Sequence, residues 1–408
     1  MKMISLLLLA FLFSSSAHRY SATPTSSASG PIRISLETGN ASGAYLTTDH
    51  RGYPVLSWVQ QVGSDAHLLY YAVSADGGRT FATPKVVPTS KGIYPHDENL
   101  SKVIYKKNGD LLAVFGVNNP NPDNRYAGML YYTQSFNAGK TWTTPKQLSP
   151  AKSYSIDERY FDVTLLTDGE IGVVWLDSRK ESHGHHHEGS SLFFSRTEGR
   201  KGFTEEKRIA ESTCQCCRTK LYQDQAGQLH VTYRAIINDS IRDMVHTASL
   251  DNGKSFSKPS RISPDNWIIK GCPHTGPTMT GNKVGTHFAW YTLGNGEGIF
   301  YCHSLKDGTF SPRENISASA SAKHPQITTT KDGSLAIVWD ERASEGTTFR
   351  VGLQTRTPEG KSIQQAFITP EAASSTHPVI MATAPTGLLV AYTQKNGDRK
   401  EVYYERRD

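Results

Sequence analysis

An internal repeat constrains the fold of this chain more than any other feature of its sequence. Seven times, a glycine precedes an apolar strand-like segment that ends in Trp, Tyr or Phe, as in Glu170–Trp175 and Ser334–Trp339. Repeats of this period with three or four strands are typical of β-propellers, so we predict an all-β, seven-bladed β-propeller. The glycines lie 48 to 60 residues apart, at positions 52, 109, 169, 227, 285, 333 and 387.

The two ends of the chain complete the predicted ring. The seventh copy stops at Asp408 after its third strand, and the leading segment Pro31–Leu36 resembles the fourth strands Pro84–Val87 and Pro145–Leu148. We therefore expect the N-terminal strand to join the last blade, so that no sheet edge is left open. Residues 31–408 would then form a single propeller domain, which we expect to be a monomer.

The first residues have the order of a secretory signal. Lys2 precedes the apolar run Ile4–Phe13, and small residues follow it. This order predicts a signal peptide over residues 1–22 and export to the periplasm or the extracellular space. Residues 23–30 are rich in Ser and Thr and are expected to form a flexible lead-in. No other window reaches the roughly 18 apolar residues of a membrane helix, so no membrane span is predicted.

A polar turn recurs after the third strand-like segment of the repeat. Its copies combine Asp or Asn with Gly and end in an aromatic residue, at 74–81, 135–142, 249–256 and, shortened, 304–310. The Asp or Asn side chain can accept local backbone N–H bonds and Gly supplies positive φ, so a structural role is expected. These turns resemble the Asp-box, or BNR, repeat of the sialidase superfamily. Because its sialidases have six blades, the resemblance keeps a six-bladed ring as an alternative.

Composition argues against several classes of function. The 44 Lys and Arg against 38 Asp and Glu leave a net charge of +6 over 408 residues, which is too thinly spread to indicate nucleic-acid binding. We also find no basic stripe with interleaved aromatics and no phosphate-binding glycine loop. Neither a nucleic-acid partner nor a nucleotide cofactor is therefore expected.

Cysteines and histidines gather where the chain enters the predicted inner strands. Four of the five cysteines lie between positions 214 and 272, and His stands beside Pro at four entrances. Equivalent positions on a ring point toward one axis, and thiolates with imidazoles select copper(I) or zinc. We therefore predict a copper or zinc site at the channel mouth. Its ligands would come from Cys214, Cys216, Cys217, Cys272 and His274, with His324, His377 and His96 as further ligands.

Disulfide bonds are the alternative for the same cysteines. In an exported protein, Cys214, Cys216 or Cys217 could pair with Cys272 and join two adjacent blades. Cys302 lies in a strand-like segment and is expected to be a buried free thiol.

A second His-rich stretch falls on the same predicted face. The loop after Trp175 contains His183-Gly-His-His-His-Glu188. Tracts of this kind bind transition metals, although a solvated loop is the alternative.

The resemblance to sialidases implies a competing function, that of an exo-α-sialidase or related glycoside hydrolase acting on a sialylated or other glycan. Sialidases bind the substrate carboxylate with three arginines, and bidentate Arg pairing suits a carboxylate. This chain offers Arg179, Arg234 and Arg342 after second strands, with Arg159 and Arg218 as further candidates. It departs from the family because its first inner strand carries no Arg and no nucleophilic Tyr/Glu pair can be placed. A non-enzymatic propeller that binds a glycan or a protein is the third interpretation.

Overall fold

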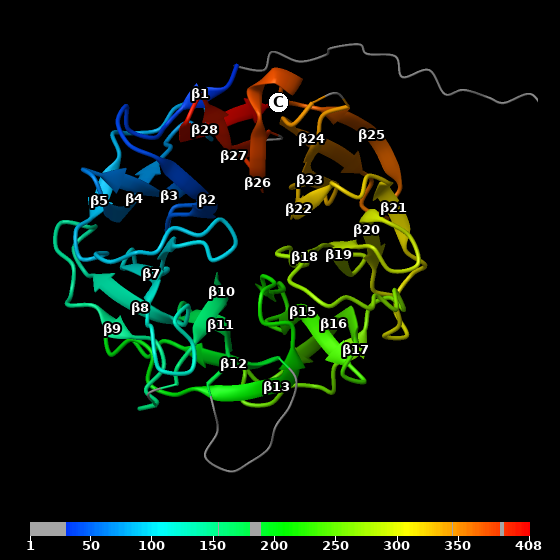
Figure 1. Ribbon diagram of the computed structural model, residues 1–408, viewed down its shortest axis with the longest axis horizontal. Coiled ribbons are helices and arrows are strands. Elements are labelled where there is room, and N and C mark those ends of the chain that lie inside the picture. The colour runs from blue at the N-terminus through cyan, green and yellow to red at the C-terminus, as the bar shows by residue number, and fades with distance from the viewer. Residues whose placement is uncertain (1–29, 154, 180–188, 345, 384–386) are drawn as a thin grey trace, which may run out of the picture.

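The computed structural model describes residues 30–408 apart from positions 154, 180–188, 345 and 384–386 (Figure 1). The predicted signal peptide, almost all of the predicted lead-in and the stretch 183–188 lie outside the described residues. In the described part, no helix is long and apolar enough to cross a membrane. The one helix found there is a short 3-10 helix, η1 (Glu371–Ala373).

Antiparallel sheets make up nearly all regular structure of the described residues, which confirms the all-β prediction. Five sheets have four strands each, and a sixth has eight. Two of the four-stranded sheets consist of β2 (Ala41–Thr48), β3 (Pro54–Val62), β4 (Ala66–Val73) and β5 (Lys85–Val87), and of β6 (Lys102–Tyr105), β7 (Leu111–Asn118), β8 (Gly128–Ser135) and β9 (Lys146–Gln147).

The eight-stranded sheet contains two runs of four strands. The runs meet where Thr213 pairs with Ala235. They are β10 (Glu158–Leu165), β11 (Ile171–Asp177), β12 (Ser190–Arg196) and β13 (Lys207–Thr213), then β14 (Lys220–Gln223), β15 (Leu229–Ile237), β16 (Ile241–Ser249) and β17 (Ser260–Arg261).

The last three sheets complete the set. One of them joins the two ends of the described chain. The sheets are β18 (Thr278–Gly281), β19 (Thr286–Thr292), β20 (Gly298–His303) and β21 (Glu314–Ser317); β22 (Lys323–Thr329), β23 (Leu335–Arg342), β24 (Phe349–Arg356) and β25 (Ser362–Phe367); and β26 (Ser375–Ala382), β27 (Leu388–Asn396) and β28 (Arg399–Arg407) with β1 (Ile32–Arg33).

The sheets are arranged around a common centre, with β2, β10, β18, β22 and β26 nearest to it (Figure 1). The first strand of each run of four contacts the first strand of the next run, and β26 contacts β2. At the chain ends, Ile32 of β1 pairs with Tyr404 of β28 and Arg33 pairs with Tyr403. The N-terminal strand therefore lies beside the last repeat, where the sequence predicted it.

The second strand of each run forms the core. These strands are buried on both faces because neighbouring sheets pack against both sides, which explains their continuous apolar runs. Fully burying a large apolar side chain contributes about 1.5 to 3 kcal/mol relative to exposing it. Four tryptophans in these second strands, at or near the end of the apolar stretch, are 0 % exposed: Trp58, Trp175, Trp290 and Trp339.

The recurring polar turns have the structural role predicted for them. In the copy at 249–256, Asp251 Oδ1 accepts the backbone N–H of Ser255 at 2.8 Å, and Ser249 Oγ accepts that of Gly253 at 2.8 Å. Phe256 then packs edge-on against Phe194 of the preceding run, with ring centroids 5.4 Å apart. Phe81 and Trp142 make similar edge contacts with Tyr404 and Tyr71, so these turns hold one run of strands against its neighbour.

A β-bulge in the inner strands positions the candidate site. In β10, β22 and β26, two residues lie opposite a single aromatic residue of the second strand, as His324 and Pro325 lie opposite Trp339. The first bulged residue has positive φ in each case: 55° at Tyr160, 53° at His324 and 52° at His377. Bulges of this kind redirect side chains and occur often beside active sites.

We expect Gly253→Ala to destabilise the protein much more than Gly199→Ala. Both glycines have positive φ, but a Cβ at Gly253 would lie 2.1 Å from Phe194 Cε1, whereas one at Gly199 would meet nothing within 4 Å. Gly199→Ala should lower the free energy of unfolding by about 1 kcal/mol, and Gly253→Ala by a further 1 to 3 kcal/mol, roughly, through overpacking. Urea denaturation measures the difference, and equal losses would contradict the packing role of the turn.

Candidate functional site

The predicted metal ligands that come together do so in two clusters. In each cluster, three potential ligand atoms lie within 4.8 Å of one another. We call them the cysteine cluster, formed by Cys214, Cys216 and Cys217, and the His–Glu cluster, formed by Glu98, His324 and His377.

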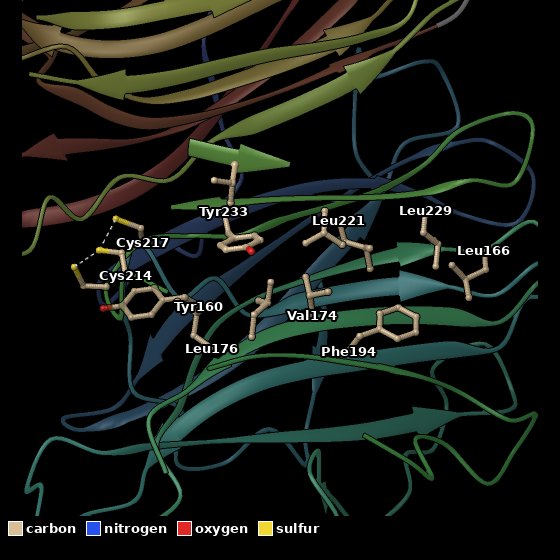
Figure 2. Close-up of a cluster of buried hydrophobic side chains, with 14 residues drawn as sticks. Tyr160, Leu166, Val174, Leu176, Phe194, Cys214, Cys217, Leu221, Leu229 and Tyr233 are labelled. Carbon is tan, nitrogen blue, oxygen red and sulfur yellow. Dashed lines mark hydrogen bonds between the residues drawn. The ribbon is translucent and has the colours of Figure 1, made fainter. Parts of the chain in front are cut away.

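The cysteine cluster lies in the connection between β13 and β14. Cys214 Sγ is 3.7 Å from Cys216 Sγ and 3.5 Å from Cys217 Sγ, as the dashed lines in Figure 2 show. All three side chains are buried. All five cysteines of the chain lie in the described part and are free thiols, and Cys302 is buried as predicted.

Electrostatics favour a negative charge on Cys214. Hydrogen bonds from the thiols of Cys216 and Cys217, together with the nearby Arg234 guanidinium, hold the pKa of Cys214 far below its ordinary value. The hydrogen bond with Cys214 raises the pKa of Cys216, and burial raises the pKa of Cys217 to about 12. Of the three sulfur atoms, that of Cys214 therefore carries a negative charge most readily.

Arg234 is a buried cation that makes its side-chain hydrogen bonds to neutral groups. It is 1 % exposed, and its guanidinium donates to the carbonyl oxygens of Arg242, Thr275 and Tyr291. Among the described residues, no carboxylate forms a salt bridge with it. Because a buried charge is costly without an opposite charge nearby, a Cys214 thiolate would compensate Arg234.

Tyr160 lies beside the cysteine cluster within the same apolar core (Figure 2). Asn99 Oδ1 accepts the Tyr160 backbone N–H at 2.8 Å, and the Tyr160 carbonyl accepts a hydrogen bond from the Thr219 hydroxyl at 3.1 Å. The cluster therefore lies in a medium of low dielectric constant, where interactions between charges are strong.

The other predicted ligands near the cysteines are less closely grouped. The ring of His96 is 6.1 Å from that of His274 and makes an edge contact with Tyr160 at 5.7 Å. Burial and the Lys323 charge lower the pKa of His274, although the Cys214 charge opposes them. Cys272 is exposed, and it belongs to neither cluster.

The His–Glu cluster brings together the entrances of three inner strands. His324 Nε2 is 3.4 Å from Glu98 Oε1, and His377 Nε2 is 3.7 Å from the same oxygen. The two imidazole rings stack with centroids 3.9 Å apart. Burial and the charge of His324 lower the pKa of His377 to about 3, so this imidazole is neutral near pH 7. Burial lowers the pKa of His324, but the Asp340 and Glu98 charges together raise it more, so the net shift is upward.

The sequence analysis did not identify Glu98 of the His–Glu cluster or the carboxylate Asp340, which contacts this cluster. Glu98 directly follows Tyr94-Pro-His-Asp97, a segment recognised only for its histidine. Asp340 accepts a hydrogen bond from His324 Nδ1 at 2.7 Å, yet it lies in a Trp-Asp-Glu-Arg segment that drew attention only to Arg342. The available signals were a carboxylate shortly before an inner strand for Glu98 and a carboxylate directly after the tryptophan of a second strand for Asp340.

The three arginines suggested by the sialidase resemblance make separate local contacts. Arg179 pairs with Asp177 at 2.5 Å and with Glu206 at 2.9 Å. Arg234 is occupied by backbone carbonyls, as described above. Arg342 is exposed at the end of β23, with its guanidinium 6.0 Å from the Phe349 ring centroid. Among the described residues, none of these contacts links one of the three arginines to another.

Comparison with solved structures identifies a sialidase-like β-propeller. The chain resembles polysaccharide lyase Uly1 with a TM-score of 0.54 and 10 % identity, over 90 % of both chains. It resembles the intramolecular trans-sialidase from Ruminococcus gnavus with a TM-score of 0.50 and 10 % identity, over 93 % of this chain and 96 % of the other. A protein of unknown function from Dyadobacter fermentans gives 0.50 and 13 %, over 92 % and 97 %. At these identities the likeness shows the fold alone.

Family comparison is consistent with the recurring turns. Residues 69–337 match the BNR repeat-like domain. The chain therefore belongs to the BNR repeat-like family. No curated protein matches it.

We expect Glu158, beside the Arg179 network, to make a contribution to stability that is lost as pH rises from about 5 to 8. Burial, reinforced by the Asp177 charge, raises the pKa of Glu158 from 4.5 to about 8. The folded state thus binds an extra proton between these values, so this contribution to stability is lost as pH rises. Glu158→Gln should reduce the loss by an amount on the order of a few kcal/mol.

Urea unfolding at pH 5 and pH 8 measures this effect. The partly exposed Glu211 is a matched control, and Glu211→Gln should leave the pH dependence unchanged. An unchanged pH dependence in Glu158→Gln would show that Glu158 ionises normally in the folded protein.

Proposed function

We propose that the protein binds one soft transition-metal ion, copper(I) or zinc, through Cys214, Cys216 and Cys217. The observation that carries this proposal is the approach of three buried sulfur atoms to within 4.8 Å of one another. Thiolates select these metals, and a cysteine thiol must lose its proton before it can bind them.

The distances between the sulfur atoms fit a shared ion. Bonds of roughly 2.3 Å to a tetrahedral metal place two sulfurs about 3.8 Å apart, whereas a disulfide bond is about 2.05 Å long. The distances from Cys214 Sγ to the other two sulfur atoms, 3.7 and 3.5 Å, lie close to the first value.

Charge also supports the proposal. Three thiolates around Zn²⁺ carry a net charge of −1, which the buried Arg234 guanidinium would compensate. The same three thiolates around copper(I) carry a net charge of −2, which one guanidinium cannot balance. Three deprotonated cysteines therefore favour zinc, and two deprotonated cysteines suit copper(I). His274 is within electrostatic range of Cys214 and is the candidate fourth ligand.

The architecture that we propose for this site is a ring of seven four-stranded blades. The contacts between successive inner strands, including β26 with β2, support it, and so does the pairing of β1 with β28. We further propose that residues 1–22 direct export, so that metal is acquired outside the cytoplasm.

Glycan binding is the second candidate function. Tyr94, before β6, and Tyr126, in the connection between β7 and β8, are 53 % and 65 % exposed. Exposed tyrosines offer a flat apolar face with a polar tip, which suits a sugar ring. The observation favours binding more than hydrolysis, because Arg179 and Arg234 are occupied by internal contacts.

We expect untagged wild-type protein, reduced and reconstituted with zinc or copper(I), to retain one equivalent of metal that depends on the cysteine cluster. Cys216→Ala should weaken this binding tenfold or more, roughly. Elemental analysis after desalting, with competition by a chelator, measures both quantities. Cys302→Ala is the matched control, because Cys302 is a buried free thiol in β20, and it should leave binding unchanged.

Two results would overturn the metal proposal. One is reduced wild-type protein that retains no metal attributable to Cys216. The other is a mass spectrum of the native protein in which two of the cluster cysteines are joined by a disulfide.

We expect no turnover of a fluorogenic sialoside above background. Two of the three arginines needed for a carboxylate are held by other groups. Fluorescence release measures the reaction, and clear activity that is lost in Arg342→Ala would support the hydrolase instead.

A further inference from the structure

We propose that Glu98, His324 and His377 form a second metal site, which takes a borderline divalent cation such as Zn²⁺, Co²⁺ or Fe²⁺. This site is distinct from the cysteine cluster in both its residues and its chemistry. Two imidazoles and one carboxylate are the donor set of many such sites, and they leave coordination positions open.

The ligand atoms already approach a common point. Glu98 Oε1 is 3.4 Å from His324 Nε2 and 3.7 Å from His377 Nε2. Bonds of roughly 2.0 to 2.2 Å in a tetrahedral site would place such atoms about 3.4 Å apart. Small side-chain movements would therefore close the site around an ion.

The surrounding groups leave these three atoms available. Asp340 Oδ2 accepts hydrogen bonds from His324 Nδ1 at 2.7 Å and from the His377 backbone N–H at 2.5 Å. Arg218 Nε lies 3.0 Å from Glu98 Oε2, on the other oxygen of that carboxylate. A carboxylate behind a histidine fixes its tautomer and directs Nε2 toward a metal.

Glu98 lacks the hydrogen bonds that a buried carboxylate requires. Its side chain is 3 % exposed, and neither carboxylate oxygen has a hydrogen bond of normal geometry in the described structure. Oε2 has the ion pair with Arg218, and Oε1 has only the contacts with the two imidazoles. The Nδ1 atom of His377 is likewise buried and without a partner there. Buried polar atoms of this kind call for an ion or a water molecule.

The local charges also favour a cation. Glu98 and Asp340 are two buried carboxylates, and Arg218 is the guanidinium beside them. Asp97 is already paired with Lys400 at 2.8 Å. On binding, a divalent cation would displace any proton from His324 Nε2 and place its own positive charge beside Glu98 and Asp340. The side chains of His324 and His377 are 12 % and 19 % exposed, so an ion can reach them from solvent.

Titration of metal-free, reduced protein with Zn²⁺, followed by calorimetry, tests the inference. Wild-type protein should bind Zn²⁺ at the His–Glu cluster, and Glu98→Gln and His377→Gln should each weaken that event tenfold or more, roughly. His67→Gln is the matched control, since His67 lies in β4 outside both clusters. Near-ultraviolet circular dichroism verifies that each variant is folded.

Co²⁺ spectra separate this inference from the proposed function. Thiolate ligation gives an intense sulfur-to-cobalt band, which Glu98→Gln should retain and Cys216→Ala should lose. Zn²⁺ binding that is lost in Glu98→Gln but kept in Cys216→Ala supports the second site even if the cysteine cluster binds nothing. Folded Glu98→Gln and His377→Gln proteins that bind Zn²⁺ as wild type does would overturn it.

Discussion

The β-bulge at the entrance of the inner strands is the constraint on which the candidate site depends. In β22 and β26, it places a histidine with positive φ directly before a proline, a combination that the backbone disfavours. Strain of this kind costs on the order of 1 to 3 kcal/mol and persists only where surrounding structure enforces it. Here the enforcing structure is the ladder to the second strand with its buried aromatic ring, opposite which the bulge lies. The stacking of His324 on His377 follows from two such bulges in adjacent sheets.

Charge balance is the second physical theme, and it differs between the clusters. The cysteine cluster lies beside a cation, Arg234, whose side-chain hydrogen bonds go to carbonyl oxygens. In the His–Glu cluster, Glu98 is paired with Arg218 and with His324, and Asp340 is paired with His324. Both clusters thus place buried charged groups beside potential metal ligands. Titratable groups in such surroundings are concentrated at functional sites, which supports the two proposals.

The sequence alone was enough to predict the architecture, but not which residues of the candidate site would come together. The repeat and the polar turns predicted the strands well, because one short pattern recurs and each copy makes the same contacts, as Asp251 does with Ser255. The equivalent offsets of the histidines predicted that they would meet, but not that His324 and His377 would join Glu98 and leave the cysteines apart. That outcome depends on the path of the long segment before β6, which no local pattern encodes. Cys272 illustrates the same limit, since the following residue, Pro273, is buried and Cys272 itself is exposed.

A single residue connects the two clusters. Arg218 directly follows Cys217 in the chain, and its guanidinium lies against Glu98. An ion held by the cysteines would fix the backbone at Cys217 and therefore the position from which Arg218 reaches Glu98. Because linkage between two binding sites is reciprocal, an ion in the His–Glu cluster would affect the cysteines by the same free energy. The two proposed sites are thus chemically separate but share one structural element, and Arg218 is the residue through which an ion in one would affect the other.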